Sequence, residues 1–199
     1  MSASLPVFFR SPPASACWEH RGARSGFEVT YIEDHDGGWR LDGTTAAIED
    51  GQPWVVTYSI QVDRAWVTRD AHIAARTPAG SGETRLSTDG QGRWLVDGRR
   101  APRLEGCLDV DLESSAMTNA LPVHRLGLVP GARADAPAAY VRVLDLAVAR
   151  LDQQYGRLDD EDGRQQYGYA APEFAFECQL AYDESGLVLD YPGIAVRTG

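Results

Sequence analysis

Residues 103–113, RLEGCLDVDLE, alternate strictly between two kinds of side chain. The even-numbered positions hold Leu, Gly, Leu, Val and Leu, whereas the odd-numbered positions are charged except for one cysteine. Only a β-strand places successive residues on opposite faces, so the pattern predicts a long strand with one apolar and one acidic face. The uncharged polar segment 114–119 follows, and it predicts a short helical turn or corner around 114–120.

Similar alternation recurs along the chain and predicts further strands. The run 54–63 places large apolar residues at its even-numbered positions, and 174–183 does the same. The sequences DGG at 36–38 and DGQG at 89–92 predict hairpin turns between strands. Residues 141–151 fit both a helical stripe and a strand, and their β-branched valines favour a strand.

We therefore expect an all-β fold of about ten to twelve mostly antiparallel strands. Long strands favour a strongly curved sheet, barrel or roll over a sandwich of short strands. No low-complexity linker divides the 199 residues, so we expect a single domain over 1–199 with an irregular N-terminal arm at 1–17.

The chain is acidic, with a net charge of −10, and all 19 of its basic residues are arginine. An acidic surface repels phosphate backbones and anionic membranes, which argues against nucleic acid as a partner. The absence of lysine excludes Schiff-base chemistry and a P-loop.

No feature of the sequence predicts export or a membrane span. The stretch ASAC at 14–17 faintly resembles a lipoprotein cleavage site, but Arg10, Pro12 and Pro13 interrupt the apolar run that a signal peptide needs. No stretch approaches the roughly 20 apolar residues of a spanning helix. We therefore expect a cytoplasmic protein.

No complete catalytic or nucleotide-binding motif is present, and no cofactor is predicted. The cluster Asp34-His35-Asp36 lies beside two glycines, where a solvated turn explains it better than a metal site. Asp109 and Asp111 share one predicted strand face, roughly 6–7 Å apart. Such a pair could perform acid–base catalysis or form a solvent-facing acidic stripe, and we expect the stripe.

The segment after the predicted strand contains other groups that could bind a ligand. Ser114, Ser115, Thr118 and Asn119 can cap a turn or hydrogen-bond a hydroxyl-rich molecule. Arg125 could clamp an anionic group or pair with a nearby aspartate. Five tryptophans and eight tyrosines could form the core or line a concave sheet that holds lipid chains or sugar rings.

Three segments together resemble the bacterial "putative glycolipid-binding" family, formerly a domain of unknown function. They are GCLDVDLESSAMTNALPVHRL at 106–126, YSIQVDRAWVTRDAHI at 58–73 and DESGLVLDYPGIAVR at 183–197. The resemblance covers nearly the whole chain and implies a spiral β-roll, an all-β half-barrel similar to bacterial lipoprotein and glycolipid carriers. The chain departs from the family at Ser115-Ala116-Met117 and at His124, where a second basic residue is common.

The resemblance also singles out candidate ligand-binding positions, although it implies no catalytic residue. These positions are Asp109, Asp111, Thr118, Asn119 and Arg125, followed by Tyr58, Trp66 and Arg69.

The leading hypothesis is a non-catalytic protein that holds an amphiphilic lipid or glycolipid in the concave face of a curved sheet. A hydrolase that uses Asp109 and Asp111 with Arg125 is the alternative from the enzyme class. A third hypothesis is a structural protein whose oligomer partners cover its open sheet edges.

Overall fold

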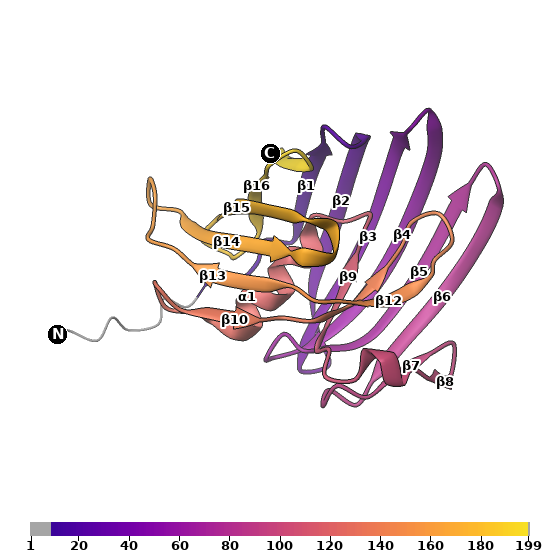
Figure 1. The fold of residues 1–199 in the computed structure, drawn as a ribbon, viewed down its shortest axis with the longest axis horizontal. Helices are drawn as coiled ribbons and strands as arrows, with labels where there is room; N and C mark the ends of the chain where they lie inside the picture. Colours follow the sequence, from indigo (N-terminus) through magenta and orange to yellow (C-terminus); the bar gives the residue numbers. More distant parts are fainter. Residues whose placement is uncertain (1–8, 199) are drawn as a thin grey trace.

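One large β-sheet forms most of the molecule, which the computed structural model describes over residues 9–198 (Figure 1). Neighbouring strands of this fourteen-stranded sheet all run antiparallel. In spatial order the strands are β10 (Arg133–Asp135), β13 (Gln154–Arg157), β14 (Gln165–Ala171), β15 (Phe176–Tyr182), β16 (Val188–Tyr191), β17 (Ala195–Thr198), β1 (Ser15–His20), β2 (Ser25–His35), β3 (Gly38–Glu49), β4 (Gln52–Asp63), β5 (Thr68–Thr77), β6 (Gly80–Thr88), β7 (Trp94–Val96) and β8 (Arg99–Arg100).

The sheet is curved but not closed. Its edge strands β10 and β8 do not pair with each other. The long strands β1 to β6 form a tall wall, and β13 to β15 cross in front of it at a steep angle (Figure 1). The predicted all-β half-barrel is therefore confirmed, although the structure has more strands than the expected ten to twelve because several are only two to four residues long.

A second sheet of three strands accompanies the large one. Its order is β12 (Val148–Leu151), β11 (Ala138–Val141), β9 (Asp109–Leu112), with β11 antiparallel to β12 and parallel to β9. Short helical elements flank it, namely η1 (Pro102–Leu104), η2 (Met117–Asn119), α1 (Ala120–Leu126) and η3 (Pro172–Phe174).

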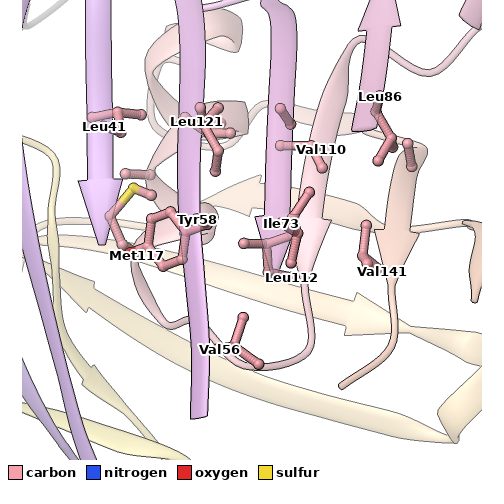
Figure 2. Close-up of a cluster of buried hydrophobic side chains, with 14 of the residues drawn as sticks. Leu41, Val56, Tyr58, Ile73, Leu86, Val110, Leu112, Met117, Leu121 and Val141 are labelled. Carbon is pink, nitrogen blue, oxygen red and sulfur yellow. The ribbon is translucent and has the colours of Figure 1, made fainter. Parts of the chain in front are cut away.

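The main core lies between the concave face of the large sheet and the segment that carries β9, η2 and α1. Val56, Tyr58 and the other inward residues of β4 are buried, as their alternation predicted. They pack in one cluster with Val110, Met117 and Leu121 (Figure 2). Each such side chain contributes roughly 1.5–3 kcal/mol by leaving water, so this cluster fixes the segment 109–126 inside the half-barrel.

Strand β2 differs from β4 in which of its faces points into the core. Its apolar residues Phe27 and Tyr31 are 59% and 60% exposed, whereas Glu28 and Thr30 are fully buried. The alternation therefore predicts the strand correctly, but in β2 the polar face points inward.

The hairpin turns of the wall follow from local chemistry. Asp36-Gly37 joins β2 to β3, and Asp50-Gly51 joins β3 to β4, all with positive φ. Two-residue loops of this kind need left-handed backbone at both positions, which Gly adopts freely and Asp tolerates.

The predicted strand over 103–113 is wrong in extent. Pro102 begins η1, and Gly106 has φ +85°, so the extended backbone of this segment is limited to Asp109–Leu112. The expectation of a solvent-facing acidic stripe is also wrong, because Asp109 is only 1% exposed and Asp111 is half-buried. Both faces of β9 are covered, so neither belongs to the outer surface.

Two other expectations have clear outcomes. The segment 141–151 does contribute strands, since β11 ends at Val141 and β12 begins at Val148 after a turn. The expected irregular arm at 1–17 overlaps β1, which begins at Ser15, and residues 1–8 lie outside the described part of the chain. Over the described residues, every helix is too short or too polar to cross a membrane.

Candidate ligand-binding cavity

A cavity of ≈ 270 Å³ lies between the small sheet and the C-terminal strands of the large sheet. Its lining combines aromatic and polar side chains, which we call the aromatic wall and the polar floor. The aromatic wall consists of Tyr140, Tyr169, Phe174, Phe176 and Tyr191. The polar floor consists of Arg24, Asp111, Glu113, Ser115 and Asn119.

The aromatic wall contains two groups of neighbouring rings: Tyr169, Phe176 and Tyr191 form one, and Tyr140 with Phe174 forms the other. Tyr191 lies 6.0 Å from both Tyr169 and Phe176, measured between ring centroids, and Tyr140 lies 5.5 Å from Phe174. Rings at such distances and inclinations support one another through edge-to-face contact. The aromatic side chains bring apolar ring surface and the phenolic hydroxyls of three tyrosines to the cavity, and both suit the C–H groups and hydroxyls of a sugar ring.

Asp111 is the central carboxylate of the floor. Its Oδ1 accepts a hydrogen bond from the Thr118 hydroxyl (2.8 Å), and its Oδ2 accepts one from the Gln153 amide (2.6 Å). Burial raises the pKa of this carboxyl to about 6; the two hydrogen bonds oppose the rise, and the negative charges of Asp109 and Glu113 add to it. Asp111 is therefore held rigidly and can gain a proton near neutral pH.

Gln153 links the floor to the wall. Its amide also donates to the Tyr169 hydroxyl (3.0 Å), so one side chain orients both Asp111 and an aromatic ring. Gln153 is 4% exposed. Sequence reasoning missed this residue, since nothing in its local pattern distinguishes it from a surface glutamine.

Asn119 is fixed from two sides. The Tyr155 hydroxyl donates to its Oδ1 (2.8 Å), and the Tyr182 hydroxyl donates to its backbone oxygen (3.2 Å). Asn119 ends η2 and directly precedes α1, so the helical corner predicted around 114–120 carries it to the cavity.

A buried carboxylate supports the floor from behind. Glu28 is fully buried, and it accepts hydrogen bonds from the Tyr58 hydroxyl (2.6 Å), the Ala116 backbone N–H (2.7 Å) and the Ser115 hydroxyl. His20 Nε2 lies 3.6 Å from the same carboxylate. Since Ser115 lines the cavity, Glu28 fixes a residue of the floor without reaching the cavity itself.

Arg24 is the basic residue of the floor. One Nη donates to the Glu113 backbone oxygen (2.7 Å), and the guanidinium lies 5.3 Å from the Trp54 ring centroid. Its Nε is buried without a hydrogen-bond partner among the described residues, and the nearest carboxylate oxygen, on Glu49, is 3.6 Å away. The floor thus combines acceptors from Asp111 with donors from Arg24.

The structure places the eight sequence-predicted residues in two groups. Asp111 and Asn119 line the cavity, Thr118 holds Asp111, and Tyr58 acts behind the floor through Glu28. The other four residues lie outside the lining, and their ligand-binding role stays a prediction; they are Asp109, Arg125, Trp66 and Arg69.

The residues outside the lining have other partners. Arg125 forms a bidentate pair with Asp109, with N–O distances of 2.9 and 2.6 Å. Trp66 stacks on His124 at 3.7 Å. Arg69 donates to the Asp89 backbone oxygen at 2.5 Å. Of the three residues of the hydrolase hypothesis, Asp109, Asp111 and Arg125, only Asp111 lines this cavity.

The fold and cavity together define an open β half-barrel protein with a site built from aromatic and hydrogen-bonding side chains. The family described as "Putative glycolipid-binding" matches residues 15–197, so the chain belongs to this family. No curated protein matches the chain.

Among solved structures, two examples show the similarity. A DUF1089 family protein from Pseudomonas aeruginosa is 31% identical, with a TM-score of 0.73, over 100% of this chain and 98% of that chain. A β-barrel-like protein from Brucella abortus, of the domain of unknown function DUF1849, is 9% identical. It has a TM-score of 0.52 over 92% of this chain and 93% of that chain, which shows a shared fold alone.

Proposed function

We propose that the protein binds an amphiphilic glycolipid and holds its sugar headgroup in the aromatic cavity. The observation that carries the proposal is the pairing of the aromatic wall with a fixed hydrogen-bonding floor around Asp111 and Asn119. Apolar walls with a few convergent polar groups are typical of small-molecule sites. The family description agrees with this class of ligand.

The size of the cavity limits what enters it. Its ≈ 270 Å³ lies below the roughly 300–1,000 Å³ of sites for drug-sized ligands, so it suits a single sugar ring and is too small for a whole glycolipid. Phe174 lines the cavity and is 52% exposed, so it marks the opening. The acyl chains would then leave the cavity past Phe174.

A matched pair of phenylalanine variants tests this proposal. The probe is a short-chain alkyl glucoside below its micelle concentration, compared with an alkyl dimethylamine oxide of equal chain length that lacks the sugar. We expect saturable calorimetric binding of the glucoside, and Phe174→Ala should weaken it about three- to tenfold, because one ring contact contributes roughly 0.5–1.5 kcal/mol. The control Phe27→Ala removes an equally exposed ring from the outer face and should leave the affinity unchanged.

Two further measurements complete the test. Asn119→Ala should reduce glucoside binding more than amine oxide binding, because it removes a group of the polar floor. Native mass spectrometry of gently purified protein should detect a bound glycolipid. The proposal fails if both detergents bind equally well and neither Phe174→Ala nor Asn119→Ala changes their affinity.

A further inference from the structure

Three arginines gather around a second hollow, which shares no lining residue with the aromatic cavity. This arginine hollow has a volume of ≈ 540 Å³ and is lined by Arg99, Arg100, Arg103, Val96, Asp97 and Ala101. It lies at β7 and β8, the edge of the large sheet that is drawn lowest in Figure 1.

The three guanidiniums differ from most others in this protein, because no carboxylate oxygen of the described residues lies within 4 Å of them. Within residues 9–198 most arginines lie within 4 Å of a carboxylate oxygen. The arginines of this range without such an ion pair are Arg76, Arg99, Arg100, Arg103, Arg133 and Arg164. Three of these six arginines therefore line one hollow, in a chain whose net charge is −10.

The backbone that carries these arginines is well anchored. Trp94, 3% exposed, donates from its indole N–H to the Cys107 backbone oxygen (2.9 Å), and the Ala101 N–H donates to the Trp94 oxygen (3.0 Å). Leu104, on the turn that carries Arg103, is fully buried. The arginines thus extend from a fixed hairpin and turn, which reduces the entropy lost when they bind.

The one acidic residue of the lining, Asp97, is hydrogen-bonded to strand β6. The Oδ1 of Asp97 accepts hydrogen bonds from the Arg85 backbone N–H (2.9 Å) and the Thr84 hydroxyl (3.3 Å) on β6. Arg103 donates from Nε to the Val148 oxygen (3.2 Å), which leaves both of its Nη groups available.

We infer that the arginine hollow binds a ligand that carries a phosphate group. Guanidinium donors match phosphate oxygens in bidentate geometry, and a phosphate has more acceptor positions for three arginines than a carboxylate has. The phosphate can belong to a small soluble molecule or to a lipid headgroup. This inference is independent of the glycolipid proposal, since it concerns a separate site.

Charge-matched variants of the intact protein test the inference. The hollow variant is Arg99→Gln, Arg100→Gln, Arg103→Gln, and the control is Arg76→Gln, Arg133→Gln, Arg164→Gln, which removes the same charge from three other exposed and unpaired arginines. Inorganic phosphate is titrated at pH 7 while NMR follows the arginine Nε–Hε signals. We expect saturable shifts at Arg99, Arg100 and Arg103, at least tenfold weaker binding by the hollow variant, and affinity within twofold of wild type for the control.

Vesicle sedimentation separates the two sources of phosphate. Binding to phosphatidylglycerol vesicles but not to phosphatidylcholine vesicles, competed by inorganic phosphate, supports a lipid headgroup. Phosphate binding without vesicle binding supports a soluble ligand. The inference is overturned if both triple variants lose binding equally, or if neither phosphate nor vesicles bind saturably. Thermal unfolding shows whether each variant folds. If the triple hollow variant does not fold, the single variant Arg100→Gln takes its place in the titration.

Discussion

Asp109 on β9 and Arg125 on α1 form a buried ion pair in which both carboxylate oxygens accept a guanidinium hydrogen bond, at 2.9 and 2.6 Å. Asp109 is 1% exposed. Burial raises the pKa of this carboxyl, and Arg125 opposes the rise. The pair joins both ends of the segment that carries Asp111 and Asn119, so it fixes the cavity floor from outside the cavity.

Removing one member of this pair should be costly. Arg125→Met leaves the Asp109 charge buried without a partner, and we expect a loss of about 3–5 kcal/mol in the free energy of unfolding. The exposed pair Arg142–Asp145 (3.7 Å) is the matched control, and Arg142→Met should cost less than about 1 kcal/mol. Urea denaturation at pH 7 measures both. If Arg125→Met and Arg142→Met lose the same free energy of unfolding, the buried pair stabilises the protein no more than the exposed pair does.

Asp111 should make the protein less stable as the pH rises. Its pKa in the folded protein is about 6, against an ordinary value of 3.8, so between these values the folded state binds a proton that the unfolded chain has lost. The free energy of unfolding therefore falls as the pH rises from about 4 to 6, by roughly 2–3 kcal/mol for this group. Asp111→Asn should remove that fall, as measured by denaturation at several pH values. The exposed control Asp159→Asn should keep the wild-type slope, and an unchanged slope in Asp111→Asn would contradict the prediction.

His124 should make the protein less stable as the pH falls, which is the opposite of the effect of Asp111. It stacks on Trp66 and packs 4.6 Å from Phe9, and burial lowers its pKa to about 4 from 6.5. Between these values the unfolded chain binds a proton that the folded state does not. Stability therefore falls as the pH drops from about 6.5 to 4, by up to about 3 kcal/mol for this group.

The variant His124→Phe tests this contribution, because it keeps an aromatic ring against Trp66 and cannot titrate. We expect it to resist acid better than wild type, measured as the difference in unfolding free energy between pH 7 and pH 4. The exposed His72→Gln serves as the control. A difference equal to that of wild type would show that His124 does not cause acid sensitivity.

Gly43 leaves the space that the Tyr58 ring occupies. The two residues are paired across β3 and β4, and a Cβ at Gly43 would lie 2.1 Å from the Tyr58 Cζ atom. Gly43→Ala should displace the ring and break its hydrogen bond to Glu28, with a loss of about 2–4 kcal/mol. The strand control Gly82→Ala meets only Leu146, at 3.7 Å, and should cost little. Thermal unfolding compares the two, and similar melting temperatures would contradict the role of Gly43.

The strands of the wall could be predicted because their pattern is local. In β4 every second residue is apolar and buried, and the Asp-Gly turns on either side of β3 need only the φ preferences of their own residues. The same rule failed at 103–113, where an alternating sequence contains a 3₁₀ turn and a left-handed glycine. Alternation describes which side chains can share a face, and it does not ensure an extended backbone.

The cavity could be predicted only in part. The sequence indicated Asp111, Thr118 and Asn119 because they lie in the segment that resembles a known family. It did not indicate Glu28, Gln153 or Arg24, whose partners are distant along the chain: Ser115 is 87 residues from Glu28, and Asp111 is 42 residues from Gln153. A buried polar residue looks like a surface residue until its hydrogen-bond partners are known.

The sequence by itself determined that this chain folds as a curved, mostly antiparallel sheet, because side-chain alternation and turn chemistry act between near neighbours. Only the tertiary structure decided which faces point inward. It buried Glu28 and exposed Phe27, and it covered both faces of β9. The physical reason is that a charge can leave water only where donors converge on it, and here the donors to Glu28 come from β4 and from the segment before η2.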